Sequence, residues 1–400
     1  MGANTYLDGS KPSVSNFDST NVLNVIFKQA TGVSNISNVK SYNFISVATA
    51  TLGIAPDTLL NAISQVISRT IFSIRPYNRK FAGLFVDNMK WGNHVRKINI
   101  GDKDWETNVS YDLIDGQSID ADIVSKPDIL QTNFYGQCVY SKHYTIFRDQ
   151  LNTALQNEAE FERFYTMLVQ NTMDMIEQCH ENTARATICN LIGGKVKGDT
   201  SNVIHLVTEY NDVTGLELNS DTVKKPENFV PFYKWAFSRI KTISGLMTER
   251  SLQYHINITG HNIMRHTPVQ NQRLYLYTPE MNNVESSVFS SVFNEQYLKM
   301  MDYEGVNFWQ SIKTPMSINV NARYITSSGA IIDDSTAGGL ATSNILGILM
   351  DEEAAGITTC GARTATTPYN ARGEYTNVWF HFNDRYWNDF TENAVVFLLD

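Results

Sequence analysis

The chain has 400 residues, 42% of them hydrophobic, and a formal net charge of −9. This composition supplies a sizeable core in one large domain or in two or three, whereas the negative charge argues against a dedicated nucleic-acid-binding protein. No apolar run reaches the roughly 18 to 20 residues of a membrane span, and the four cysteines lack CxxC spacing, which favours free thiols in a reducing compartment.

Charge is distributed unevenly along the chain. Residues 1–100 carry ten Lys or Arg against four Asp or Glu, a balance of +6. Residues 101–128 carry eight Asp or Glu against two Lys, a balance of −6. A basic segment followed directly by an acidic one predicts pairing between the two kinds of surface.

The N-terminal third is expected to contain an arm and a long hairpin. Residues 1–55 are polar with little periodicity, which is typical of an extended arm without its own core. A helix is predicted over 57–72. Strands are predicted over 94–100 and 129–146. The acidic segment between them has roughly 28 residues, which makes a loop long enough to be functional or ordered by a partner.

One long amphipathic helix is predicted over 158–192. Asn157 caps its start, and Gly193 and Gly194 are expected to end it. About 35 residues at 1.5 Å each span on the order of 50 Å, which suits a structural spine better than a catalytic pocket. Its apolar stripe, at steps of three and four, consists of Phe161, Phe164, Tyr165, Leu168, Thr172, Met175, Ile176, Cys179, Thr183 and Ala186.

The rest of the chain is predicted to mix helices and strands. An irregular segment is expected over 195–227 and Gly- and Ser-rich loops over 318–372. Helices are expected over 229–247 and 285–299. Strands are expected over 255–259, 273–277, 345–350, 375–382 and 394–399.

Residues that could carry chemistry are few. His255, His261 and His266 form the best metal-like cluster, but they lack the convergent spacing of a zinc site. Glu177 and His180 are expected on a solvated helical face. We therefore predict no catalytic residue, no metal and no cofactor, and keep a metal-dependent hydrolase using the three histidines as an alternative.

The basic-aromatic segment RPYNRKF at 75–81 could grip nucleic acid by charge and stacking. Pairing with an acidic protein surface is the favoured interpretation, because residues 101–128 supply such a surface. The residues expected to take part are Arg75, Arg79, Lys80, Arg96, Lys97, Asp102, Asp104, Glu106, Asp112 and Asp115.

The order of elements resembles the HK97-type major capsid proteins of tailed bacteriophages. Two segments resemble the major head proteins of small phi29-like podoviruses: DTLLNAISQVISRTIFSIRPYNRKFAGL at 57–84 and, more specifically, NARGEYTNVWFHFNDRYWNDFTENAVVFLL at 370–399. The resemblance implies an α+β, HK97-type capsid fold. Its expected parts are an N-terminal arm and helix (1–86), an E-loop hairpin (87–146), a P-domain with the spine helix (147–224), an A-domain (225–371) and a return to the P-domain (372–400).

The resemblance implies a non-enzymatic major capsid protein of the virion, made in the bacterial host cytoplasm. It is expected to self-assemble into hexamers and pentamers of an icosahedral or elongated head enclosing double-stranded DNA without sequence-specific binding. Scaffolding and portal proteins are its expected partners, and no membrane is involved. An encapsulin-like compartment shell is the alternative with the same fold.

Reversing Arg79 and Lys80 to Glu should block shell assembly and leave a soluble, folded subunit, because opposite charges on neighbouring subunits set register and partner choice. Electron microscopy and circular dichroism of the variant test this expectation. Normal shells would contradict it.

Overall fold

The computed structural model describes residues 80–86, 95–103, 113–119, 122, 124, 126–150, 158–284, 302–333 and 339–400. The predicted arm, the 57–72 helix and the 285–299 helix lie outside these residues. The described helices are α5 (Glu158–Gly198), α6 (Leu206–Thr214), α7 (Pro226–Met247) and α8 (Thr278–Val284). None of them is both long and apolar enough to cross a membrane.

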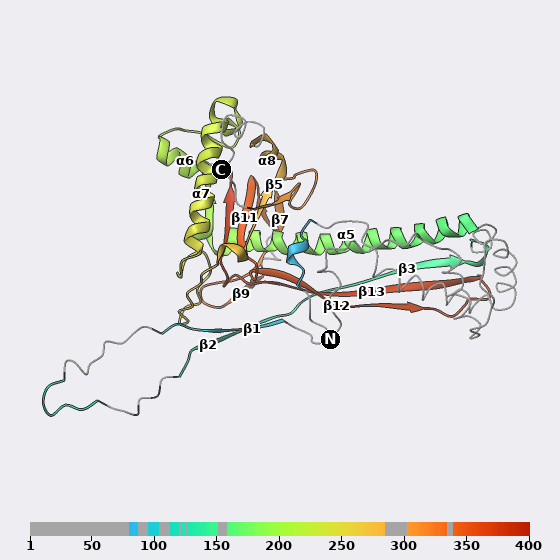
Figure 1. Ribbon diagram of the computed structural model, residues 1–400, viewed down its shortest axis with the longest axis horizontal. Coiled ribbons are helices and arrows are strands. Elements are labelled where there is room, and N and C mark those ends of the chain that lie inside the picture. Colours follow the sequence, from blue (N-terminus) through green and yellow to red (C-terminus); the bar gives the residue numbers. More distant parts are fainter. Residues whose placement is uncertain are drawn as a thin grey trace, which may run out of the picture. The chain divides into compact units, whose positions relative to one another are not determined.

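The described strands, in chain order (Figure 1), are β1 (Val95–Ile100), β2 (Ile129–Phe134), β3 (Gly136–Phe147), β4 (Val203–His205), β5 (Gln272–Tyr277), β6 (Glu304–Val306), β7 (Ile318–Val320), β8 (Arg323–Ile325), β9 (Ile331–Asp333), β10 (Leu340–Thr342), β11 (Ile345–Asp351), β12 (Ala355–Thr366), β13 (Tyr375–Asn388) and β14 (Ala394–Leu398).

The chain divides into two compact units. The first contains Met1–Asn78, Val139–Gln178 and Ala362–Phe382. The second contains Arg79–Cys138, Cys179–Gly361 and Asn383–Asp400. These units do not follow the five expected parts, so the E-loop, P-domain and A-domain boundaries stay predictions.

The second unit is built on a five-stranded sheet in the order β4-β14-β11-β5-β6. β11 is antiparallel to both β14 and β5, whereas β4 and β6 pair in parallel at the edges. Every residue of β11 and β14 is buried. Strands buried on both faces read as continuous apolar runs, and both were predicted correctly for that reason.

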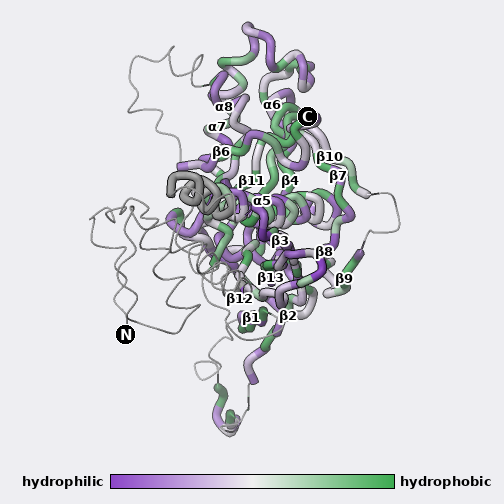
Figure 2. The backbone as a smooth tube through the Cα atoms, turned by 90° about the vertical axis from the view of Figure 1, so that its right-hand side faces the viewer, coloured by the Kyte–Doolittle hydropathy of each residue, from purple (hydrophilic) through white to green (hydrophobic). Residues whose placement is uncertain are grey.

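Two hydrophobic layers cover the opposite faces of this sheet, because successive side chains of a strand point to opposite sides. Ile348 and Val396 pack in one layer with Ile188 of α5. Leu349 and Val395 pack in the other layer with α6 and α7 side chains such as Tyr210, Phe232 and Ile240. Figure 2 shows hydrophobic stretches of the tube around β11 and β4.

In the first unit, β12, β13 and β3 contribute to a three-stranded sheet in that order. His143 of β3 stacks on Trp379 of β13 with ring centroids 4.4 Å apart. The Thr145 hydroxyl donates to Asn377 Oδ1 at 2.7 Å. These side-chain pairs join two strands that lie more than 200 residues apart in the sequence.

Helix α5 does not end at Gly193 and Gly194, as expected from the sequence, but continues to Gly198. The glycines serve close packing instead of a left-handed cap. A Cβ atom on Gly194 would lie 2.3 Å from Phe390 Cζ, and one on Gly193 would lie 2.5 Å from Val320 Cγ2. The side chains of Phe390 and Val320 therefore approach the helix backbone closely at these two glycines.

The predicted buried stripe of α5 was wrong at its C-terminal end. Ala186 is exposed, whereas Ala184, Ile188 and Leu191 are fully buried. Glu177 and His180, expected on a solvated face, are buried at 7% and 8% exposure. Burial of His180 is compatible with folding because its Nε2 faces an acid, with Asp384 Oδ2 at 3.5 Å.

Other sequence expectations also met mixed outcomes. The 195–227 segment is not irregular, since it contains β4 and α6, and the 318–372 segment contains four further strands besides β11 and the long β12. Residues 255–259 do not form the predicted strand. The helix at 229–247 and the strand at 273–277 are confirmed.

Gly194→Ala should lower the free energy of unfolding by about 1 to 3 kcal/mol, because the new methyl group overlaps Phe390. Gly245→Ala in α7 is the matched control: it is exposed, helical and open around its Cα. It should be neutral or stabilising by up to about 1 kcal/mol. Urea unfolding measures the free energy of unfolding of both variants. Equal values for the two would contradict the packing role of Gly194.

Candidate functional site: the clamped hairpin

The strands β1 and β2 form a separate two-stranded ribbon in the second unit (Figure 1). They are antiparallel, with Val95 opposite Phe134 at one end and Ile100 opposite Ile129 at the other. This confirms the predicted hairpin. In the expected 129–146 strand, however, the chain is interrupted at Tyr135, so that β2 pairs with β1 and β3 joins another sheet.

The ribbon has two different faces, because side chains alternate along each strand. Its inner face is the less exposed one and consists of Val95, Lys97, Asn99, Leu130, Thr132 and Phe134. Its outer face is exposed and consists of Arg96, Ile98, Ile100, Ile129, Gln131 and Asn133. Ile98, Ile100 and Ile129 are 53%, 67% and 56% exposed.

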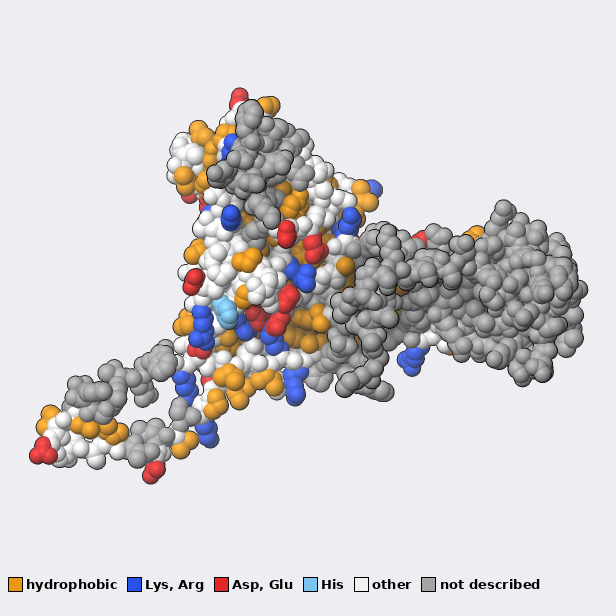
Figure 3. Space-filling model, in the orientation of Figure 1, with side chains coloured by type: hydrophobic (Ala, Val, Ile, Leu, Met, Phe, Trp, Pro, Cys, Tyr) orange, Lys and Arg blue, Asp and Glu red, His pale blue; other side chains and the backbone are white. Residues whose placement is uncertain are grey.

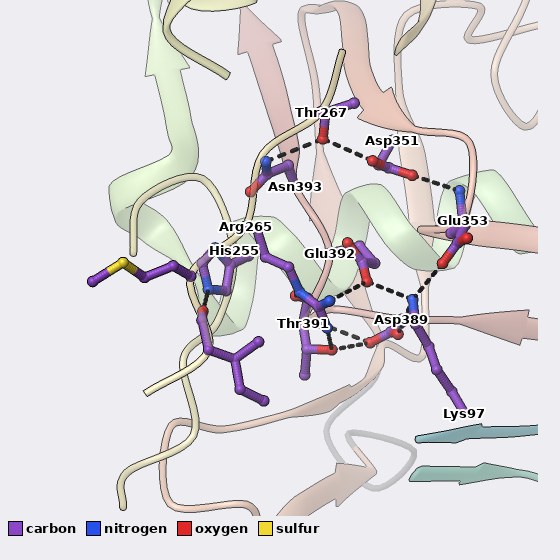
Figure 4. A network of polar contacts seen from close by, with 12 residues as sticks. Lys97, His255, Arg265, Thr267, Asp351, Glu353, Asp389, Thr391, Glu392 and Asn393 are labelled. Atoms are coloured by element: carbon purple, nitrogen blue, oxygen red, sulfur yellow. Dashed lines mark hydrogen bonds and ion pairs between the residues drawn. The ribbon is translucent and has the colours of Figure 1, made fainter. Parts of the chain in front are cut away.

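Lys97 reaches from the inner face into an acidic pocket of its own chain (Figure 4). Its Nζ lies 2.5 Å from Glu392 Oε1, 2.9 Å from Glu353 Oε2 and 3.2 Å from Asp389 Oδ2. The pocket comes from the turn between β11 and β12 and from the segment leading into β14. We call Lys97, Glu353, Asp389, Glu392 and Arg265 the ionic cluster.

Arg265 supplies the second cation of the ionic cluster. Its Nη1 lies 3.0 Å from the same Oε1 of Glu392, and its Nε donates to the Thr391 carbonyl oxygen at 3.0 Å. The Thr391 amide and hydroxyl both donate to Asp389 Oδ1, which fixes the carboxylate beside Lys97. Asp389 is therefore positioned by its neighbour Thr391, and Glu392 by Arg265 and Lys97.

Burial and charge act against each other in this cluster. Burial raises the pKa of Glu392 to about 7, although Lys97 and Arg265 both favour its ionised form. Burial alone would lower the pKa of Lys97, but Asp389 and Glu392 outweigh that effect and raise it. Lys97 therefore stays protonated, and Glu392 titrates near neutral pH.

The ribbon is held at a second place, at the end where β1 and β2 lead into the 101–128 loop. The Asp102 carboxylate pairs with Arg250 and accepts the Met264 amide at 3.0 Å, while the Asp102 amide donates to Asn262 O at 2.6 Å. Across the hairpin, Asp128 Oδ2 lies 2.6 Å from His261 Nδ1. Figure 3 shows basic, acidic and histidine side chains gathered near the loop end of the ribbon.

The ten predicted inter-subunit residues have different surroundings. Arg75, Arg79, Asp104, Glu106 and Asp112 lie outside the described residues. Lys80, Arg96 and Asp115 are exposed. Lys97 and Asp102 have ionic partners within the chain, which the sequence analysis did not foresee, so any pairing of these two with another subunit would compete with those partners. Their inter-subunit role stays a prediction.

The alternative metal site gains no support from the geometry. Both ring nitrogens of His255 face backbone carbonyls, at 2.9 Å from Gln253 O and 3.0 Å from Ile263 O. His261 is turned to Asp128, and His266 is exposed. Within the described ranges, no three His, Cys, Asp or Glu side chains are placed to hold a metal ion together.

Comparison with known proteins decides the family. The family model described as Phi29-like phage major capsid protein matches residues 23–398. The chain belongs to the Phi29-like phage major capsid protein family. This confirms the resemblance carried by residues 57–84 and 370–399. No curated protein sequence matches the chain.

Solved structures confirm the HK97-type fold of this major capsid protein. The capsid structure of Staphylococcus phage Andhra is similar with a TM-score of 0.52 and 11% identity, over 81% of this chain and 84% of that chain. A structure of the head fiber and inner core protein gp22 of native bacteriophage P68 is similar with a TM-score of 0.55 and 9% identity, over 81% and 85%. The protein is a structural component of the phage capsid.

The raised pKa of Glu392 predicts a pH-dependent stability of the capsid subunit. Between its ordinary value of 4.5 and about 7, the folded chain binds a proton that the unfolded chain has released. The stability of the wild-type subunit relative to Glu392→Gln should therefore fall by up to roughly 3 kcal/mol as pH rises through this window.

Urea unfolding at about pH 5 and about pH 8 measures this difference. Gln cannot ionise, so the variant controls for every other titrating group. If the difference in unfolding free energy between wild type and variant were the same at both pH values, the raised pKa of Glu392 would be contradicted.

Proposed function

We propose that this major capsid protein self-assembles into hexamers and pentamers that form the phage head shell around double-stranded DNA. The single observation that carries the proposal, beyond family and fold, is the two-faced hairpin. Its inner face is held by the ionic cluster, while its outer face exposes Ile98, Ile100 and Ile129 beside Arg96. An exposed apolar patch on a positioned ribbon is suited to a second copy of the chain.

The charge distribution supports the same function. The chain has a net charge of −9, with the basic excess in residues 1–100. Opposite charges on the basic segment and the acidic hairpin loop would set the register between neighbouring subunits. A negative shell would also avoid gripping the DNA that it encloses. We further propose assembly in the host cytoplasm with scaffolding and portal proteins, and the hairpin acts as the E-loop.

Electron microscopy of the full chain expressed alone tests this function, because shells, rings and monomers are easily distinguished. Particles are expected at high subunit concentration. An encapsulin-like compartment would form particles too, but it would hold a cargo enzyme, whereas shells assembled in infected cells should hold DNA. Persistent monomers in the presence of the other head proteins would contradict self-assembly.

Replacing Ile98, Ile100 and Ile129 together by Thr should reduce the yield of assembled particles by at least about tenfold, because the apolar area lost from the outer face no longer contributes to association. Thr is β-branched and keeps the strand preference of the ribbon. Sedimentation of assembly reactions measures the yield.

Ile312→Thr is the control for the loss of an exposed isoleucine. Ile312 is 77% exposed and lies outside the hairpin. Its replacement should leave assembly unchanged, and all variants should unfold at the wild-type temperature. Equal particle yields from the triple variant and the control would contradict the role of the outer face.

A further inference from the structure

The ribbon is attached to its unit in a way that permits release. β1 and β2 pair with each other and not with the five-stranded sheet, so no strand ladder joins the ribbon to that sheet. Besides the packing of its half-buried side chains, the inner face is held by the ionic cluster in the middle of β1 and by the contacts of Asp102 and Asp128 at the loop end of the ribbon. None of these ionic contacts is made by a residue of β11 or β14.

The ionic cluster depends on Lys97 for its charge balance. Asp389 and Glu392 are only 1% and 5% exposed. With all three acids ionised and Lys97 in place, three carboxylates face two cations, a net charge of −1. Without it, the same three face Arg265 alone, a net charge of −2. Lys195 of α5 also acts on Asp389, but its Nζ is bound to Asp199 at 2.8 Å.

We propose that Lys97 is an ionic latch, which fixes the direction of the β1–β2 hairpin against the acidic pocket and whose opening frees the hairpin from its unit. This proposal rests on the proposed function in one respect, namely that the hairpin, whether held or freed, serves assembly. A buried acid left without its cation is strongly unfavourable, so the pocket itself drives the hairpin into the held position. The hairpin direction is thereby set by one lysine and not by the ribbon's own pairing.

The charge count provides a way to separate the latch from general stability. At a pH well above the pKa of Glu392, where all three acids are ionised, Lys97→Met changes the net charge of the cluster from −1 to −2 and should both release the hairpin and destabilise the fold. Lys97→Met combined with Glu392→Gln returns the net charge to −1. This double variant should recover much of the unfolding free energy while its hairpin stays released, because no ammonium enters the pocket.

Hydrogen exchange of the unassembled full-length subunit measures hairpin release. A two-stranded ribbon without tertiary support is only marginally stable in water, so in the double variant the amides of β1 and β2 should exchange at least about tenfold faster than in the wild type, while amides of β11 and β14 stay protected. Lys97→Arg should keep the hairpin protected. Glu352→Gln is the matched control, since Glu352 lies in the same turn as Glu353 but binds Asn271 and faces Arg273.

Protected β1 and β2 amides in the double variant would overturn the latch. In the wild type, the free energy of opening measured by exchange should be lower for the ribbon than for β11. If the ribbon and β11 opened together, the latch would also be overturned, and this test holds even if no Lys97 variant folds. Since exchange is measured on single subunits, failure of the latch is distinguishable from failure of the proposed assembly, which wild-type electron microscopy tests.

Discussion

The complete burial of β11 and β14 is the constraint on which the rest of the second unit depends. Both faces of these strands are covered, one by α5 and the other by α6 and α7. Their ends are therefore held firmly, and the short segments at those ends carry charged residues. Glu353 follows β11 and precedes β12, while Asp389 and Glu392 directly precede β14. The acidic pocket is thus a consequence of how the apolar sheet ends.

The hairpin is positioned by this pocket because its two faces differ in chemistry. Lys97 occupies the inner face by strand alternation, beside Val95 and Asn99, and its long apolar stem lets the ammonium reach the buried acids. The outer face has isoleucines at three positions and remains exposed. A flexible ribbon could not present such a patch to a second subunit in one direction, and the clamp at Lys97, Asp102 and Asp128 supplies the direction.

A second constraint is the close approach of side chains to the backbone of α5. Gly193 and Gly194 allow Val320 and Phe390 to contact α5 directly. Phe390 lies in the sequence between Asp389 and Glu392, two of the three acids of the pocket, so the packing that holds α5 also holds these two in place. Helix packing and the ionic cluster are therefore linked through a few residues of the return segment.

The sequence by itself determined the capsid family, the long helix, the β1–β2 hairpin and the buried strands β11 and β14, because these depend on local periodicity and on continuous motifs such as FTENAVVF. It also indicated that charge matters near Lys97 and Asp102. Only the tertiary structure decided which charges meet. Lys97 and Glu392 are 295 positions apart, and neither periodicity nor composition reports on such a pair. The role of Gly194 was hidden for the same reason, since a glycine near a helix end predicts a cap unless the side chain that packs on it is known.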